Sequence, residues 1–277
     1  MTPRIAPYHT VRMRSRADAR EPPSAASATL AAGSLARVAH MLGKLLASLF
    51  AQDADRARKK AAHDATRRAI ESYVASHPVR KLHLGAGPGS PQGWLSTDVT
   101  PQSDAVVCLD ATERFPIADG TFDYVFSEHM IEHLSWPAGL AMLRECNRVL
   151  RPGGTIRVAT PDLAVLLGLY RAKAGPAGER YVRWITDHCL PGIRTYRAAF
   201  VINNAFRSWG HQFLYDGELL ELALAEAGFA NIRRSACGDS TDAELRGIET
   251  HGRNVGDEEM AAFETMVFEA DRPHEAR

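Results

Sequence analysis

The residues that most clearly suggest chemistry begin with a glycine-rich turn. The segment Lys81-Leu-His-Leu-Gly-Ala-Gly-Pro-Gly89 reads as an apolar strand that runs into three glycines. Without a Cβ, and with positive φ accessible, such a turn lets the backbone approach a nucleotide-like ligand closely. A tight turn with no ligand would carry the same glycines. The next predicted strand ends at Asp98, whose carboxylate can accept hydrogen bonds from both hydroxyls of a ribose.

Further polar residues follow the third and fourth predicted strands. Asp110-Ala111 comes directly after the third strand, and the fourth strand runs into Ser127-Glu-His-Met-Ile-Glu-His133. His129, His133 and His211 are candidate bases, because an imidazole can take up a proton near neutral pH. For each histidine the alternative is a ring that only hydrogen-bonds within its own loop.

Two neighbouring patterns have less specific readings. His129 and His133 are four residues apart with Glu132 between them, as in some metal sites, but no third ligand is evident in the sequence. We therefore predict no metal ion. Glu249, His251 and Arg253 could reach the mouth of a substrate site, or could lie in a surface loop.

The composition predicts one large α/β domain with appendages. The chain has 277 residues, of which 45% are hydrophobic, enough for one sizeable core. Its four cysteines show no CxxC spacing, which favours a reduced, cytoplasmic protein. The chain has 33 Lys and Arg and 33 Asp and Glu. Residues 1–80 contain 14 of the basic and 6 of the acidic residues, so residues 81–277 are acidic overall. An acidic domain argues against a nucleic-acid substrate.

The N-terminal region differs from the rest. Residues 1–28 contain Arg, Pro, Ser and Ala with few large apolar side chains, which predicts a disordered basic tail. Residues 29–78 should form a helical extension that starts with an amphipathic helix over Leu30–Phe50. That helix could dock on its own domain or on a partner protomer, or could make weak contact with an anionic membrane surface. Arg37, His40 and Lys44 interrupt its apolar residues, which argues against a membrane-spanning helix.

From about residue 79 to the C-terminus, short apolar runs alternate with helical patterns, as in a parallel sheet covered by helices. One helix should start at Ser135 and end at Leu150, and another should run from Asp216 to Gly228. Residues 163–210, rich in aromatics and arginine, predict an inserted cap. Seven strands are expected, over Lys81–Leu84, Leu95–Asp98, Ala105–Leu109, Phe122–Phe126, Thr155–Ala159, Ile232–Ala236 and Glu264–Glu269.

Taken in order, these motifs resemble the class I S-adenosylmethionine-dependent methyltransferases, and most of all the compact group related to the type 11 methyltransferase domain. The likeness is close over Lys81–Leu163 and looser over His211–Ala270. It implies a Rossmann-like sheet of order 3-2-1-4-5-7-6 with an antiparallel last strand. It also implies S-adenosylmethionine as cofactor and methyl transfer to a small-molecule or glycan acceptor. The cofactor-binding positions that it implies are Gly85, Ala86, Gly87, Asp98, Val99, Asp110, Ala111, Ser127 and Glu128.

The sequence departs from the full-length pattern in two respects. The third position of the glycine motif is displaced, with Pro88 between Gly87 and Gly89. Only 13 residues separate Gly85 from Asp98, and only 12 separate Asp98 from Asp110, so the helices after strands one and two should be shortened or missing. Two other functions share some of these motifs. One is a nicotinamide-dependent oxidoreductase, which needs a full helix after the glycines to bind pyrophosphate. The other is a methyltransferase fold that binds a ligand without catalysis. The acceptor and the oligomeric state stay open.

Overall fold

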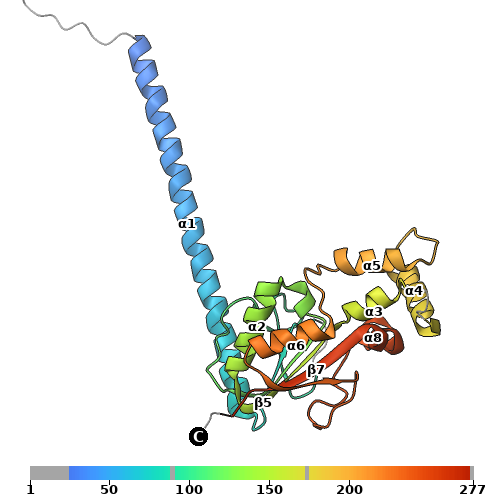
Figure 1. Cartoon of the computed structure of the whole chain (residues 1–277). Coiled ribbons are helices and arrows are strands. Elements are labelled where there is room, and N and C mark those ends of the chain that lie inside the picture. Colours follow the sequence, from blue (N-terminus) through green and yellow to red (C-terminus); the bar gives the residue numbers. More distant parts are fainter. Residues whose placement is uncertain (1–24, 88–90, 172–174, 275–277) are drawn as a thin grey trace, which may run out of the picture. The chain divides into compact units, whose positions relative to one another are not determined.

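The computed structural model describes residues 25–87, 91–171 and 175–274 (Figure 1). The chain divides into two units, residues 1–58 and residues 59–277. One helix, α1 (Ala25–Ser76), covers the expected extension without a break. It starts four residues before the predicted boundary at residue 29, and most of the predicted disordered tail, residues 1–24, lies outside the described residues.

The last turns of α1 belong to the second unit and pack on its sheet. Ile70 and Tyr73 join the main hydrophobic core. The Tyr73 hydroxyl donates to the carbonyl of Gly93 over 2.8 Å and accepts from the backbone N–H of Lys81 over 2.9 Å. Thr66 donates its hydroxyl to the carbonyl of Cys108. This part of the helix is therefore fixed to the first three strands by directional bonds as well as by apolar packing.

The second unit is built on a seven-stranded sheet of order β3-β2-β1-β4-β5-β7-β6, which confirms the expected order. The strand pairs from β3 to β5 are parallel, whereas β7 runs antiparallel to both β5 and β6. The strands are β1 (Lys81–Leu84), β2 (Leu95–Asp98), β3 (Val107–Cys108), β4 (Phe122–Glu128), β5 (Leu150–Pro161), β6 (Ala230–Ser235) and β7 (Thr265–Asp271).

The strand bounds differ from expectation mainly in β5. This strand was expected from Thr155, but it starts at Leu150 and includes Gly153 and Gly154. A register shift between Phe122 and Tyr124 lets β4 follow this irregular start. Between β1 and β2 the described residues include no helix, as the short spacing predicted.

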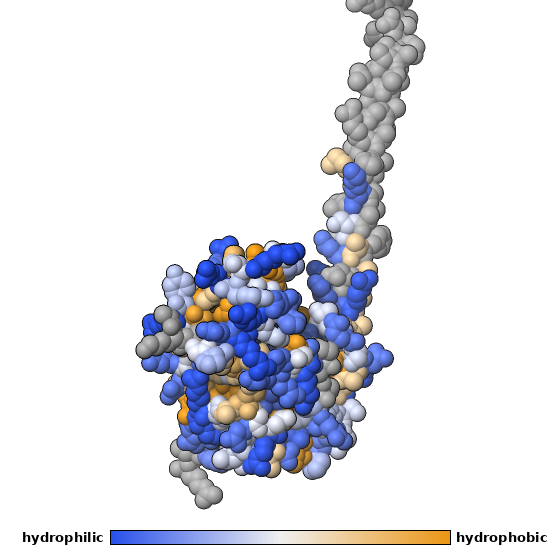
Figure 2. Space-filling view, turned by 90° about the vertical axis from the view of Figure 1, so that its right-hand side faces the viewer, coloured by the Kyte–Doolittle hydropathy of each residue, from blue (hydrophilic) through white to orange (hydrophobic). Residues whose placement is uncertain are grey.

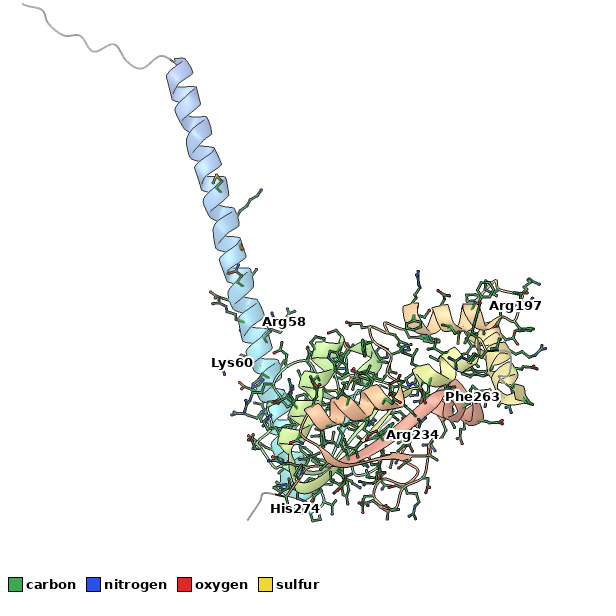
Figure 3. All side chains as sticks on the ribbon, in the orientation of Figure 1. Arg58, Lys60, Arg197, Arg234, Phe263 and His274 are labelled. Carbon is green, nitrogen blue, oxygen red and sulfur yellow. The ribbon has the colours of Figure 1, made fainter. Side chains whose placement is uncertain are left out.

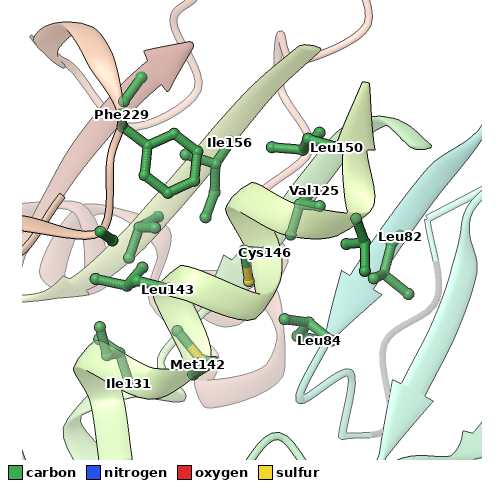
Figure 4. Close-up of a cluster of buried hydrophobic side chains, with 14 of the residues drawn as sticks. Leu82, Leu84, Val125, Ile131, Met142, Leu143, Cys146, Leu150, Ile156 and Phe229 are labelled. Atoms are coloured by element: carbon green, nitrogen blue, oxygen red, sulfur yellow. The ribbon is translucent and has the colours of Figure 1, made fainter. Parts of the chain in front are cut away.

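Helices cover the sheet and close its core. The helix α2 (Trp136–Val149) starts after Ser135 with a proline in its first turn, and α6 (Gly217–Glu226) starts after Asp216, which accepts the N–H of Leu219. Both starts were predicted. Short helices η1 (Ile131–His133), α7 (His251–Val255) and α8 (Glu258–Glu264) occupy connections. Figure 4 shows the core between α2 and the strands, formed by Leu82, Leu84, Val125, Met142, Leu143, Cys146 and Ile156, which are all fully buried.

The expected cap is present as three helices, α3 (Leu163–Gly168), α4 (Gly175–Cys189) and α5 (Ala198–Arg207). A parallel bridge between Asp162 and Tyr215 joins the two ends of this insertion. The cap shares a small separate hydrophobic core with α8, which includes Tyr181 of α4 and Met260 of α8. Figure 3 shows Phe263 of α8 below the cap and Arg197 at the cap's outer edge.

The outer surface of the second unit is mainly hydrophilic in the view of Figure 2, where hydrophobic residues lie in separate small groups. Among the described residues, no helix is long and apolar enough to cross a membrane.

Candidate active site

The glycine turn after β1 has the conformation that its sequence predicts. Gly85 and Gly87 have φ of +66° and +52°, in the left-handed region that glycine adopts without strain. A Cβ on Gly85 would lie 2.3 Å from Cγ of Met130, so the turn needs glycine there to pack against the loop after β4. A Cβ on Gly87 would meet nothing within 4 Å. The turn is thus closed on its Gly85 side and open at Gly87.

Asp98 at the end of β2 is hydrogen-bonded to this turn. Its Oδ2 accepts the N–H of Gly87 over 3.0 Å, and its Oδ1 accepts the N–H of Thr100 over 2.8 Å. Ala86 donates its N–H to the carbonyl of Thr97. A carboxylate has about four acceptor positions, so two remain on Asp98 for hydroxyl groups of a ligand.

Asp110 and its neighbours lie beside Asp98, because β3 pairs with β2. Asp110 is exposed, and its Oδ1 accepts the N–H and the hydroxyl of Thr112. The side chain of Val99 is 62% exposed, which is unusual for a large apolar residue directly after a buried strand. Val99 and Ala111 are apolar residues that directly follow the two carboxylates, Asp98 and Asp110.

The two residues at the end of β4, Ser127 and Glu128, differ in their hydrogen bonds. Ser127 is fully buried, and its hydroxyl has no hydrogen-bond partner among the described residues. Glu128 has three close donors, which are the N–H and the hydroxyl of Thr250 and the N–H of His251. The Glu128 carboxylate therefore holds the loop at residues 250–251 against the end of β4.

A cavity of about 520 Å³ opens next to these strand ends. It is lined by Gly85 and Gly87 of the turn and by all three histidines that the sequence singled out, His129, His133 and His211. Asp98, Val99, Asp110 and Ala111 are not part of this lining. The tertiary structure thus separates the predicted residues into two groups. One group lies at the ends of β2 and β3, and the other, which includes the glycine turn, lines the cavity.

His129 forms a close pair with Glu132. Its Nδ1 lies 3.4 Å from Oε1 of Glu132, and its Nε2 lies 2.8 Å from the hydroxyl of Thr265. The backbone of His129 has φ of +46°, which turns the chain sharply after β4. Burial disfavours the imidazolium, but the neighbouring Glu132 carboxylate outweighs this effect and raises the pKa of His129. Glu132 itself is fully buried, and burial is outweighed by His129, which lowers the pKa of the carboxyl.

His251 is a fourth histidine of the cavity. Its ring stacks on His129 with centroids 3.7 Å apart, and burial, followed by the charge of His129, lowers its pKa to about 4. The sequence offered it only as one member of a loop pattern. Its N–H donates to Glu128, and Glu249 in the preceding loop accepts over 2.6 Å from buried Arg157, which also donates to Glu269 over 2.6 Å. No local signal could have shown that ion pair.

Two other residues at the cavity were not foreseen. Glu264 at the end of α8 is buried, and it accepts a hydrogen bond from the hydroxyl of Tyr181 in α4. Burial raises the pKa of Glu264. Trp209 and His211 contribute the cap side of the lining, and burial lowers the pKa of His211. The cavity therefore combines imidazole, carboxylate and indole groups within one enclosure.

Comparison with known proteins identifies part of this fold. Residues 82–158 match the model of the type 11 methyltransferase domain. A malonyl-[acyl-carrier protein] O-methyltransferase of Laribacter hongkongensis is 36% identical over 110 residues, which are 40% of this chain and 36% of that protein. An uncharacterized 37.1 kDa protein in a transposon of Streptomyces fradiae is 28% identical over 130 residues, which are 38% of this chain and 36% of that protein.

These matches span about a third of the length of either relative. Among solved structures, a SAM-dependent methyltransferase of Archaeoglobus fulgidus aligns with a TM-score of 0.40 and 15% identity, over 76% of this chain and 94% of that chain. The domain match covers the glycine turn, Asp98, Asp110 and the first histidines, which are the positions that carry the motifs. Residues 82–158 thus match a methyltransferase domain, and the sheet around them has the strand order that the resemblance implies.

Proposed function

We propose that the protein transfers a methyl group from S-adenosylmethionine to a small-molecule or glycan acceptor bound in the 520 Å³ cavity. The observation that carries the proposal is the joint lining of this cavity by the glycine turn and by five histidines. A cofactor held at the turn would adjoin the same space as the groups that could bind and deprotonate an acceptor.

Gly85, Gly87, Asp98, Val99, Asp110 and Ala111 are the residues that we assign to the cofactor. Asp98 would accept the ribose hydroxyls with its two remaining acceptor positions, and the Val99 and Ala111 surface would contact the base. S-adenosylmethionine, when bound, supplies a methyl group on a positively charged sulfur. We do not assign the methionine part to Glu128, because its carboxylate already accepts three hydrogen bonds.

The histidines belong to the acceptor side of the site. His211 and Trp209 come from the cap, whereas His129 and His133 come from the loop after β4, so an acceptor would lie between them. Enclosure orients the acceptor and excludes water, which favours a displacement that needs alignment more than covalent catalysis. A neutral imidazole there can take the proton that a hydroxyl or amine acceptor loses.

Thermal-shift titrations of the full chain with S-adenosylmethionine, S-adenosylhomocysteine and NADH test this function. Binding to the folded state raises the melting temperature by mass action. The first two ligands should raise it and NADH should not. Stabilisation by NADH alone would replace methyl transfer with the oxidoreductase function.

The acceptor side is tested separately by His211→Asn. Once an acceptor is found, by mass spectrometry of small molecules that copurify, this variant should lower turnover while its cofactor affinity stays within about twofold of wild type. The matched control is His188→Asn, which also lines the cavity but is bonded to its own helix at Trp184. Normal S-adenosylmethionine binding without turnover of any copurified molecule would favour a binding protein instead.

A further inference from the structure

Glu132, His133 and His211 bring their metal-binding atoms within 4.8 Å of one another at the wall of the cavity. The sequence offered His129 and His133 without a third ligand. The fold adds His211 from the far end of the cap and uses Glu132 in place of His129. We propose that these three residues bind a divalent transition-metal ion of the Zn²⁺ type.

The two segments that carry these ligands are fixed to each other by their backbones. Gln212 and Phe213 donate their N–H groups to the carbonyl of Glu132 over 2.8 and 3.1 Å. The side-chain amide of Gln212 donates to the carbonyl of His133 over 2.8 Å. The ligands are therefore presented by a built site, and closure onto an ion requires only side-chain movement. Ligands about 2.1 Å from a tetrahedral ion are about 3.4 Å apart, so no separation would have to shrink by more than about 1.4 Å.

Two of the three ligands, His211 and Glu132, already have the supporting hydrogen bond that metal ligands usually have. The Nδ1 of His211 is 2.7 Å from the carbonyl of Ala205, so it carries the proton and leaves the Nε2 lone pair free. Oε2 of Glu132 accepts the hydroxyl of Thr160 over 2.9 Å. Oε1 of the same carboxylate is buried and has no hydrogen-bond partner among the described residues, with Nδ1 of His129 as a 3.4 Å ion-pair contact.

His133 completes the set. No hydrogen bond to its ring is found within the described part of the chain, and its ring meets that of His211 edge to face with centroids 5.0 Å apart. Two imidazoles and one carboxylate are typical ligands of zinc sites that keep an open position. They do not suit Mg²⁺, which prefers oxygen ligands alone. Because all three residues line the cavity, the open position would face the bound acceptor.

A second cluster nearby, His129, His251 and Glu264, is less suited to an ion. Both ring nitrogens of His129 are engaged, one by Glu132 and the other by Thr265. Glu264 is hydrogen-bonded to Tyr181. The rings of His129 and His251 are stacked 13° from parallel, an arrangement that does not direct two nitrogen lone pairs at one point. This cluster provides the comparison for the experiment.

The test is isothermal titration of the full chain with Zn²⁺ after EDTA treatment and dialysis, without S-adenosylmethionine. Wild type should bind one Zn²⁺ per chain, and Mg²⁺ should not compete. His133→Asn should weaken Zn²⁺ binding at least tenfold. Because the His133 ring makes no hydrogen bond within the described residues, this variant removes none there, and circular dichroism checks that it folds. His211→Asn and Glu132→Gln should have the same effect, whereas His188→Asn should bind like wild type.

Cobalt substitution gives a second readout. Co²⁺ added to the metal-free protein should produce visible absorption bands of a low-coordinate site, and His133→Asn should lose them. Two results would overturn the proposal. One is that folded His133→Asn does not differ from wild type, either because both bind Zn²⁺ with equal affinity or because neither binds it. The other is loss of binding in His251→Asn with binding retained in His133→Asn, which would place the ion in the neighbouring cluster. Neither result depends on whether the protein transfers methyl groups.

Discussion

The backbone N–H of Gly87 donates to Oδ2 of Asp98 over 3.0 Å, so the carboxylate that ends β2 fixes the glycine turn that follows β1. The same carboxylate accepts the N–H of Thr100 and keeps two acceptor positions. One side chain thus shapes the turn and is available to a ligand. This dual use makes Asp98 the most informative position for the proposed cofactor site.

Replacing Asp98 by Ala should weaken S-adenosylmethionine binding at least tenfold. Each ribose hydrogen bond to a charged acceptor is worth about 1.5–3 kcal/mol, and loss of the bond to Gly87 also loosens the turn. Calorimetric titration measures the affinity. Asp104→Ala, an exposed carboxylate in the next loop, is the matched control and should bind like wild type. Unchanged affinity in a folded Asp98→Ala protein would remove this residue from the site.

Replacing Glu128 by Gln should destabilise the loop that carries His251. The charged carboxylate accepts three hydrogen bonds there, and the neutral amide cannot accept all of them as well. We expect the free energy of unfolding to fall by about 1–3 kcal/mol, measured by urea denaturation. Glu113→Gln, at an exposed position, should change it by less than about 0.5 kcal/mol. Equal stability of the two variants would contradict the anchoring role.

His83 should make the protein less stable in acid. Burial lowers its pKa from 6.5 to about 4, although the negative charge of Asp98 acts in the opposite direction and raises the pKa. The ring is 1% exposed. Above pH 6.5 it is neutral in both the folded and the unfolded chain, and it has no effect on pH dependence. Between pH 6.5 and 4 only the unfolded chain takes up the proton. The free energy of unfolding therefore decreases as the pH is lowered, by up to about 3 kcal/mol.

The measurement is the free energy of unfolding of wild type and His83→Gln from pH 7 to pH 4.5. The variant should lose less stability over this range, because its side chain does not titrate. Parallel curves would show that His83 binds its proton equally in the folded and the unfolded chain.

Tyr73 should anchor the end of α1 to the sheet through its hydroxyl. Tyr73→Phe keeps the ring against Phe122 but removes the bond to Gly93 and leaves the N–H of Lys81 unpaired. The expected cost is about 1–3 kcal/mol of unfolding free energy, visible as a lower melting temperature. Tyr170→Phe, at a side chain that is 74% exposed, is the control and should melt like wild type.

Local patterns in the sequence were sufficient for much of the fold. The bounds of β1 and β2 and the starts of α2 and α6 were predicted as found, because apolar spacing and capping residues act within a few positions along the chain. The sheet order followed from the resemblance and is confirmed. By contrast, the fifth strand was expected from Thr155 but starts at Leu150, because Leu150 pairs with Phe122 of β4 across the sheet.

Only the tertiary structure decided how the histidines are grouped. His211 is 78 residues from His133 in the sequence, and the cap brings them together through backbone bonds to Glu132. His251 lies at the cavity on a loop that Glu128 binds through the N–H of His251, and Glu249 of this loop pairs with buried Arg157, 92 residues away in the sequence. The sequence determined which residues could do chemistry, since that depends on side-chain type. It did not determine which of them meet, because contacts between distant segments are set by the packing of the whole domain.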